Sequence, residues 1–138
     1  MNNNKIKLKS VINKKYINKI YLWSKKNRCL IDLVNFLKLE FNIDCSIDRE
    51  IIQSYDRDWS NINGRADALS RPINEFECAI ILYTCQIIKI PITISAGRTN
   101  LNGSATPIGG MVLSIEKLKS PNIIVNKHNK TVTAPVGI

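Results

Sequence analysis

Apolar side chains recur at helical spacing over residues 30–41. Leucine, valine or phenylalanine stands three, four, seven and eleven residues after Leu30, and Asp32 and Lys38 are among the polar residues between them. This pattern is typical of an amphipathic helix that buries one face. The sequence therefore predicts a helix over residues 30–41 that packs against another element.

A second helix is predicted over residues 75–88, and its start is well marked. Asn74 is a suitable cap, and Glu77 follows three residues later, as in a capping box. The predicted stripe along one face consists of Phe76, Ile80, Tyr83, Thr84, Ile87 and Ile88.

Two short runs of strand-forming residues flank the second helix. Residues 66–71 end before Pro72, and residues 90–95 are rich in isoleucine, so both runs are predicted as strands. A strand, a helix and a strand in this order predict a right-handed βαβ unit. We therefore expect residues 66–71 and 90–95 to be parallel neighbours.

With the other predicted segments, the chain is assigned to the α+β fold class. We expect a small βαβ-containing subdomain of a larger fold, preceded by an N-terminal helical segment. Turn-forming residues and short apolar runs alternate along the other segments. The predicted segments are a polar stretch at 42–65 with a helical turn at 49–54, a small-residue loop at 95–110, a strand at 111–115, and a hairpin with arms at 123–125 and 131–134.

The positive charge of the chain is concentrated at its N-terminus. The formal net charge is +9, and residues 1–28 contain nine Lys and Arg and no acidic residue. Residues 29–138 therefore have no net charge. We divide the chain into a basic Lys/Asn-rich arm, residues 1–29, and a domain over residues 30–138. We favour a solvated arm over a nucleic-acid-binding arm, because runs of charge usually remain solvated.

An interaction module is the alternative interpretation of the arm. Its lysines are interleaved with Tyr16, Tyr21 and Trp23, a combination that suits RNA or an anionic surface. Residues 1–13 lack the apolar periodicity that ordering requires, so their deletion is expected to leave thermal stability nearly unchanged.

The inventory of reactive side chains excludes several classes of site. The chain has four cysteines and one histidine, His128. The cysteines, Cys29, Cys45, Cys78 and Cys85, lack the spacing of metal-binding motifs. We interpret the cysteines as buried thiols of a cytoplasmic protein and His128 as an exposed turn residue. No run of 18 apolar residues is present, so no membrane span is predicted.

Candidate chemistry is concentrated in the segment from Ser95 to Pro107. Small residues there allow backbone N–H groups to converge on an oxyanion, and Gly97 and Gly103 can take positive φ where the chain must curl. Arg98 adds a positive charge. The segment matches neither the Walker pattern nor the G-x-G-x-x-G fingerprint, so an ordinary surface loop remains the alternative.

The motifs around this loop resemble a known family. In chain order they are Tyr55-Asp56-Arg57-Asp58-Trp59-Ser60, Arg65 to Pro72, Ile90-Pro91, Ala96 to Gly103, Pro107, Gly109-Gly110 and Thr131 to Gly137. Together they resemble the start of the PCMH-type FAD-binding domain of FAD-linked oxidoreductases, which has the vanillyl-alcohol-oxidase-type FAD fold. D-lactate, glycolate and D-2-hydroxyglutarate dehydrogenases are members. The resemblance covers roughly residues 30–138.

The resemblance implies that FAD is the cofactor and that the loop wraps its pyrophosphate. The implied cofactor-binding residues are Ser95, Ala96, Gly97, Arg98, Thr99, Asn100, Leu101, Gly103 and Ser104. Arg98 departs from the consecutive glycines of the family, and a positive φ there is expected to compromise the loop. Asp56 and Asp58 are interpreted as turn formers and helix caps rather than as an acid/base pair.

Family members continue far beyond the part that this chain resembles. The resemblance therefore implies an FAD-binding fragment or subunit of a 2-hydroxy-acid oxidoreductase that lacks the substrate domain. We expect no 2-hydroxy-acid oxidation by the chain alone, and we expect a separately encoded C-terminal remainder as its partner. The small 2-hydroxy acid would bind only to the complete enzyme. No catalytic residue and no metal ligand is assigned, and nucleic acid is not an expected partner.

Overall fold

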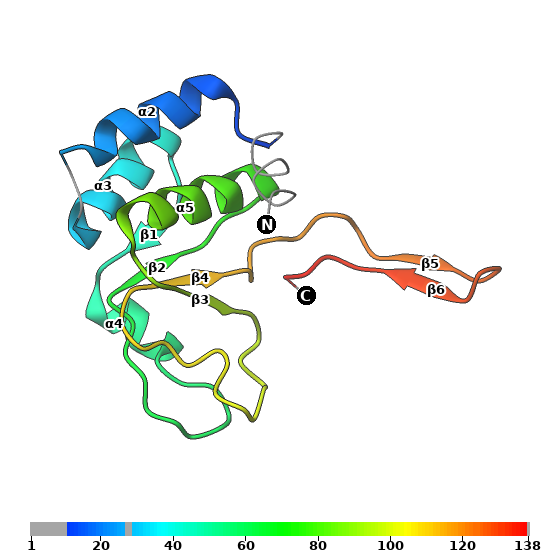
Figure 1. Ribbon diagram of the computed structural model, residues 1–138. Coiled ribbons are helices and arrows are strands. Elements are labelled where there is room, and N and C mark those ends of the chain that lie inside the picture. The colour runs from blue at the N-terminus through cyan, green and yellow to red at the C-terminus, as the bar shows by residue number, and fades with distance from the viewer. Residues whose placement is uncertain (1–10, 27–28, 138) are drawn as a thin grey trace, which may run out of the picture.

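The computed structural model describes residues 11–26 and 29–137, and it has a mixed α+β architecture (Figure 1). Its main sheet contains four strands in the spatial order β1-β2-β4-β3. The strands are β1 (Cys45–Ser46), β2 (Ala68–Ser70), β3 (Ile92–Ser95) and β4 (Met111–Ser114). β4 is parallel to both of its neighbours, and β1 is antiparallel to β2.

The side chains of the central strands point alternately into two hydrophobic cores, one on each face of the sheet, and helices cover both faces. Met111 and Leu113 of β4 belong to the main core, under α2 (Lys14–Ser24), α3 (Leu30–Phe41) and α5 (Glu75–Ile88). Val112 belongs to a second core with residues of α4 (Arg49–Ile52) and the 3-10 helix η1 (Gln53–Tyr55). Successive residues of a strand point to opposite faces, so β4 is buried on both.

The two helices predicted from periodicity are confirmed at both ends. α3 and α5 have the expected bounds, and the Asn74 side chain accepts a hydrogen bond of 2.8 Å from the backbone N–H of Glu77. The Glu77 carboxylate accepts from the N–H of Ile73 at 3.0 Å. Local capping and one apolar face were sufficient to define these elements.

The expected pairing of the βαβ unit is wrong in one respect. β2 and β3 run parallel, but β4 lies between them and pairs with each. The central position suits β4 because all four of its residues are buried, whereas Ile94 of β3 is exposed. The most apolar strand therefore occupies the middle of the sheet, although it comes last of the four in the chain.

Part of the N-terminal arm packs on the domain. Ile12 and Ile20 are 1% and 0% exposed in the main core, and Tyr16 contacts the rings of Phe41 and Phe76. Ile12 contradicts the expectation that residues 1–13 contribute nothing to the ordered structure. Residues 1–10, 27 and 28 lie outside the described residues, and the boundary at residues 29 and 30 stays a prediction.

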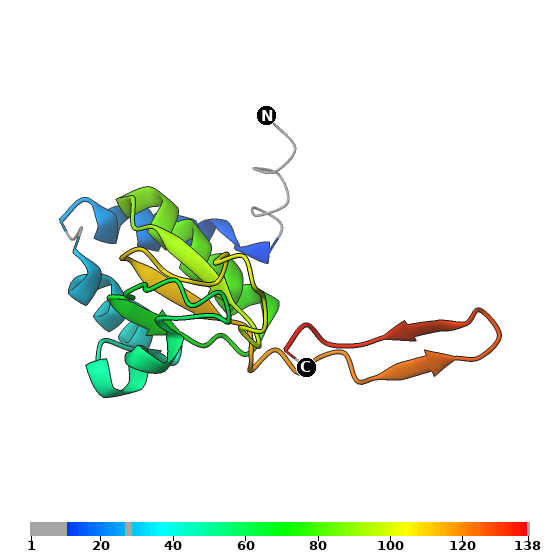
Figure 2. The same ribbon diagram turned by 90° about the horizontal axis from the view of Figure 1, so that it is seen from below.

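A β-hairpin projects from the body of the molecule in both views (Figures 1 and 2). Its strands, β5 (Ile124–Asn126) and β6 (Thr131–Thr133), pair in antiparallel fashion and differ from the predicted arms by one residue. Every residue of both strands is exposed. The hairpin is therefore not part of either core.

Candidate functional site: the loop after β3

The predicted FAD loop leaves the sheet at the carboxyl end of β3, as expected. Ser95 is the last residue of β3, is fully buried and pairs with Ser114 of β4. The eight other predicted cofactor residues lie between Ala96 and Ser104, beside the segment 56–66 (Figure 1). Ser95 therefore belongs to the strand, and its hydroxyl has no hydrogen-bond partner among the described residues.

A buried carboxylate, Asp58, holds the loop in place. The side-chain amide of Asn100 and the backbone N–H of Ala105 donate to its Oδ2, the latter at 3.3 Å. The N–H of Ser60 donates to its Oδ1 at 2.9 Å, and so does the Ser60 hydroxyl. One side chain thus joins the loop to the segment that follows η1.

These hydrogen bonds also determine the protonation state of Asp58. Burial by itself raises the pKa of a carboxyl group, but the bonds from Ser60, Asn100 and Ala105 outweigh it and hold the pKa of Asp58 well below its usual range. Asp58 is therefore ionised at neutral pH. It acts as a fixed acceptor and does not serve as a proton donor.

Positive φ occurs at Arg98 and Gly103 rather than at Gly97. The φ angles of Arg98 and Gly103 are 56° and 76°, whereas Gly97 lies outside the left-handed region. Of the two glycines that can take positive φ, Gly103 does so and Gly97 does not. A left-handed conformation costs a non-glycine residue roughly 1–2 kcal/mol.

Two contacts offset the strain at Arg98. Its guanidinium carbon lies 4.5 Å from the centroid of the Tyr55 ring, and its carbonyl accepts a hydrogen bond of 3.2 Å from the N–H of Trp59. A cation–π contact contributes about 0.5–2 kcal/mol. These contacts hold the backbone of the loop at Arg98. The positive φ is the condition under which we expect the loop to be compromised as an FAD site, and its effect on FAD binding stays a prediction.

The two loop glycines differ in their surroundings. A Cβ added to Gly97 meets only Thr99 Cγ2, at 3.9 Å, so this backbone faces open space. A Cβ added to Gly103 would stand 2.7 Å from Ile62 Cδ1. The space beside Gly97 is therefore free for a ligand, whereas the space beside Gly103 is filled by the side chain of Ile62.

A pocket of about 210 Å³ adjoins the loop. It is lined by Ala96, Gly97, Arg98, Glu116, Val136 and Gly137. The Nη1 atom of Arg98 is buried and has no hydrogen-bond partner among the described residues. The positive charge of Arg98 beside an exposed, small-residue backbone is suited to an anion.

Tyr55 connects the two charged residues of this pocket. Its ring supports Arg98, and its hydroxyl donates a hydrogen bond of 2.8 Å to Glu116 Oε1. Burial and the neighbouring Glu116 raise the pKa of Tyr55, so the phenol remains protonated at neutral pH. The tyrosine is a neutral and permanent donor.

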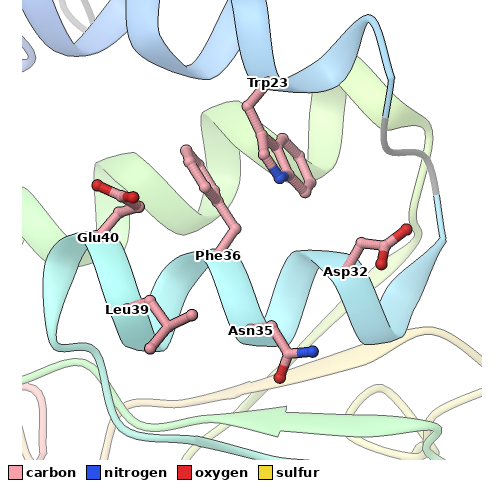
Figure 3. Close-up of a pocket in the computed structure, with 6 residues that line it drawn as sticks. All are labelled: Trp23, Asp32, Asn35, Phe36, Leu39 and Glu40. Carbon is pink, nitrogen blue, oxygen red and sulfur yellow. The ribbon is translucent and has the colours of Figure 1, made fainter.

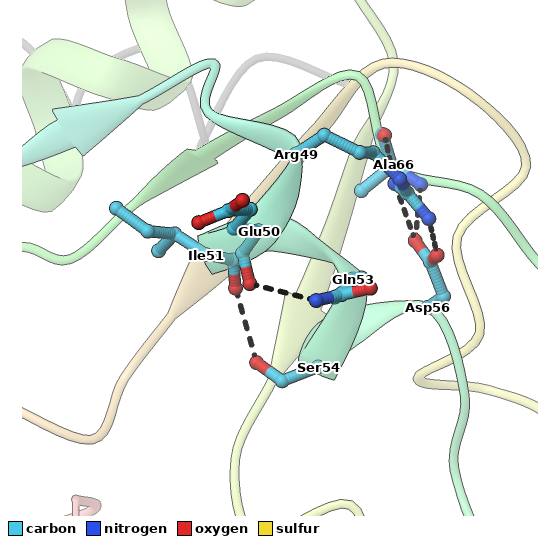
Figure 4. Close-up of polar contacts among 7 residues, drawn as sticks. All are labelled: Arg49, Glu50, Ile51, Gln53, Ser54, Asp56 and Ala66. Carbon is cyan, nitrogen blue, oxygen red and sulfur yellow. Dashed lines mark hydrogen bonds and ion pairs between the residues drawn. The ribbon is translucent and has the colours of Figure 1, made fainter.

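An ion pair of Arg49 with Asp56 fixes the segment that carries Tyr55 (Figure 4). Arg49 Nη1 also donates to the carbonyl of Ala66 at 3.3 Å, and Asp56 Oδ1 accepts from the Ala66 N–H at 2.9 Å. Burial raises the pKa of Asp56, but these partners outweigh it and lower the pKa. Asp56 is the C-cap residue of η1, and the Asp58 side chain accepts from the N–H of Ser60 two residues later, as in an Asx turn. Both residues are thus a cap or a turn former, as expected.

A second groove, of about 260 Å³, lies between α2 and α3 (Figure 3). Trp23 and Phe36 stack there with ring centroids 4.3 Å apart. The acidic residues of this groove already have partners, because Asp32 accepts from the Cys29 thiol and Glu40 pairs with Lys19. We assign no function to this groove.

The aromatic residues of the arm are largely committed to packing. Tyr16 contacts Phe41 and Phe76, and Trp23 stacks on Phe36. Both rings are half-buried as a result, which reduces the aromatic surface that an RNA-binding module would need.

The cysteines and the histidine are only partly as expected. Burial raises the pKa of the Cys45 and Cys85 thiols to about 12. Cys29 is exposed at the start of α3 and Cys78 is half-buried, which corrects the expectation that all four thiols are buried. His128 is exposed in the hairpin turn, and the described residues contain no group of three potential metal ligands.

Sequence reasoning did not assign Asp58, Tyr55 or Glu116 to the site. The first two lie in a motif of the family resemblance, which was a usable signal, but their contacts with the loop are not visible in the sequence. Glu116 had no signal, because it lies 61 residues from its partner Tyr55.

Comparisons with known proteins support the fold only. No protein family profile matches the sequence, and no curated protein matches it. Among the described residues, no helix is long and apolar enough to cross a membrane.

One similar solved structure is the Physcomitrella patens BBE-like 1 variant D396N. It has 12% sequence identity and a TM-score of 0.57, and the match covers 73% of this chain and 22% of that one. The chain thus spans about a fifth of the length of this neighbour, so the activity of the whole neighbour does not transfer to it. What the likeness shows is the fold alone: this chain has a mixed α+β fold that matches part of the neighbour's structure.

Proposed function

We propose that the chain binds the pyrophosphate of FAD through the loop after β3. The proposed binding residues are Ala96, Gly97, Arg98, Thr99, Asn100, Leu101, Gly103 and Ser104. Ser95, which is fully buried at the end of β3, positions the start of the loop. The observation that carries the proposal is a pocket lined by Arg98 beside the open backbone of Gly97. The fold of the BBE-like neighbour supports the same ligand.

The residues present fit a diphosphate. Asp58 holds the loop from behind through Asn100 and Ala105, so the loop is organised before a ligand arrives. Arg98 supplies the charge, and exposed Thr99 adds a neutral donor. When bound, FAD supplies hydride acceptance, while the chain's own residues bind and orient the cofactor.

The function of the chain in this proposal is that of a fragment or subunit of an FAD-linked 2-hydroxy-acid oxidoreductase. A hydrogen bond to a charged group contributes about 1.5–3 kcal/mol, whereas association costs an estimated 4–15 kcal/mol. The few bonds available therefore give micromolar or weaker affinity. The 2-hydroxy acid binds only when a complementary polypeptide completes the enzyme.

The exposed hairpin supports such a partner. Ile124, Val125 and Val132 are 57%, 62% and 66% exposed, and each strand has one unpaired edge among the described residues. A polypeptide that covers the hairpin would bury this apolar surface and pair its edges. The proposed partner is a separately encoded remainder of the enzyme.

The test is calorimetric titration of the full chain with FAD, compared with the variants Gly97→Val and Gly97→Ala. The Val side chain enters the open space beside the loop and is expected to abolish binding, while Ala is expected to weaken it by less than tenfold. Thermal unfolding of both variants is the control, and it is expected to match the unmodified chain because Gly97 has no close neighbour. Unchanged FAD binding by Gly97→Val would contradict the proposal.

A further inference from the structure

Two loops form one surface at the end of the molecule that lies away from α2 and α3 (Figure 1). The loops are residues 57–66 and 96–108, and together we call them the tip. The N–H of Trp59 donates to the carbonyl of Arg98 at 3.2 Å, and Asp58 accepts from Asn100 across the two loops. The tip is therefore held together by hydrogen bonds between segments that are distant in the sequence.

Four large apolar side chains of the tip are in contact with solvent. They are between 52% and 92% exposed, and they belong to Trp59, Ile62, Leu101 and Ile108. Ile62 lies against the second loop, because its Cδ1 is 2.7 Å from the position of a Cβ added to Gly103. Exposed apolar surface of this extent is typical of an interaction site.

The tip is also positively charged. Its two loops contain three arginines and a single carboxylate, Asp58. Asp58 is buried and occupied by hydrogen bonds within the tip, whereas Arg57 and Arg65 are exposed and form no ion pair among the described residues. The exposed side chains of the tip thus combine apolar groups with cations and include no anion.

The spacing of the apolar side chains favours a lipid surface over a protein. Ile62 stands between two asparagines, and so does Leu101. The core of a protein interface is contiguous and poor in charge, whereas a lipid headgroup layer hydrates polar neighbours and admits separate apolar side chains below them. Tryptophan is enriched at this depth. RNA is less suited, because the tip has only one ring on which a base could stack.

We propose that the tip binds the surface of an anionic phospholipid membrane. Its four apolar side chains enter the boundary between headgroups and acyl chains, and Arg57 and Arg65 contact the headgroups. The hydrogen bonds of Asp58 order the tip in advance, which lowers the entropic cost of binding. The inference is independent of the FAD proposal, because Trp59, Ile62 and Ile108 are outside the residues assigned to the cofactor.

The experiment measures sedimentation of the full chain with vesicles of about 30% phosphatidylserine in phosphatidylcholine. Ile108→Ser is expected to weaken vesicle binding about tenfold or more, because an isoleucine no longer enters the apolar layer. Leu39→Ser is the matched control: Leu39 is 84% exposed, but it lies on α3, away from the tip. It is expected to change binding by no more than about twofold, and thermal unfolding checks that both variants are folded.

Tryptophan fluorescence reports which part of the chain enters the membrane. The emission of Trp59 is expected to shift to shorter wavelength when vesicles are added, because the exposed ring leaves water. The shift is expected to be absent in Trp59→Phe, which retains the half-buried Trp23. A shift that persists in Trp59→Phe would overturn the proposal.

The charge of the tip is tested against the charge of the arm. Arg57→Gln is expected to weaken vesicle binding about fivefold, the loss for one basic residue near a lipid surface. Lys15→Gln removes the same charge from α2 and is expected to weaken it less. Equal losses from these two variants, or from Ile108→Ser and Leu39→Ser, would attribute binding to non-specific adsorption and overturn the proposal.

Other partners of the tip are distinguished by the same variants. No sedimentation with anionic vesicles at low salt would overturn the proposal, and a Trp59 shift caused by single-stranded RNA instead would assign the tip to nucleic acid. A dimer in solution that Ile108→Ser dissociates would assign it to a second copy of the chain and would also overturn the proposal. FAD titration of Ile108→Ser is expected to match that of the unmodified chain, so a failure here leaves the FAD proposal standing.

Discussion

The main sheet and the projecting hairpin contain similar residues in opposite environments. Met111, Val112 and Leu113 of β4 are at most 2% exposed, whereas Ile124, Val125 and Val132 of the hairpin are at least 57% exposed. β4 has a parallel neighbour on each side and apolar contacts on both faces. Within the described residues, the hairpin strands form backbone hydrogen bonds as strands only with each other.

This difference shows that strand propensity does not by itself decide how stable a strand pair is. An isolated two-stranded hairpin is marginally stable in water, because it buries little apolar surface for the conformational entropy it loses. We call the main sheet with its helices the body of the molecule. The body is expected to unfold as one cooperative unit, and the hairpin is expected to open independently of it. The predictions below test that division.

The largest effect is expected from shortening a buried side chain of the body. Leu113→Ala in β4 removes a side chain that is 2% exposed and leaves a cavity, so it is expected to lower the free energy of unfolding by about 2–5 kcal/mol. Val132→Ala in the hairpin is the matched control, with an expected loss below about 0.5 kcal/mol. Urea unfolding measures both, and equal losses would show that the hairpin belongs to the cooperative unit.

Acid is expected to act on the body and spare the hairpin. Contacts lower the pKa values of Asp44, Asp56 and Asp58 in the folded chain, although burial acts in the opposite direction. Their contribution to stability is therefore complete above the unfolded pKa of about 4 and is lost as the pH falls through the lower folded values.

Residues 117–138 contain no carboxylate side chain, so the hairpin lacks this source of acid sensitivity. The free energy of unfolding is expected to be constant from pH 5 to 7 and to fall below about pH 4. Asp58→Asn is expected to make the fall shallower. Chemical denaturation at each pH measures this, and an identical slope for Asp58→Asn would show that its hydrogen bonds do not stabilise the folded state.

A smaller effect is expected at two left-handed lysines, one in each region. Lys89 ends α5 with φ 63°, and Lys130 lies in the hairpin turn with φ 51°. Lys89→Gly relieves strain in the body and is expected to raise the free energy of unfolding by about 0.5–1 kcal/mol. Lys130→Gly relieves similar strain but is expected to leave global unfolding unchanged, and a matching gain from it would contradict independent opening.

The smallest effect on stability is expected from a charge placed on the hairpin. Val125→Lys removes an exposed apolar side chain and is expected to change the free energy of unfolding by less than about 0.5 kcal/mol. Light scattering at rising concentration is expected to decrease, because the strand edges become less able to pair with other chains. Asn129→Lys adds the same charge in the turn, and an equal decrease there would attribute the effect to net charge alone.

Local patterns were sufficient to predict the two best-defined helices and the position of the loop. The periodic apolar positions after Leu30 and the cap at Asn74 involve residues within a few turns of each other, so they are visible in the sequence. The small residues after β3 likewise indicated a loop at the carboxyl end of a strand. The family motifs indicated its ligand, which stays a proposal.

Contacts between distant segments account for what the sequence did not reveal. The place of β4 between β2 and β3 and the packing of Ile12 and Ile20 depend on which apolar surfaces meet. The site depends in the same way on pairs such as Asp58 with Asn100, which are 42 residues apart. Spacing along a chain determines which side chains share a face of one element, whereas burial of whole faces against each other determines which elements become neighbours.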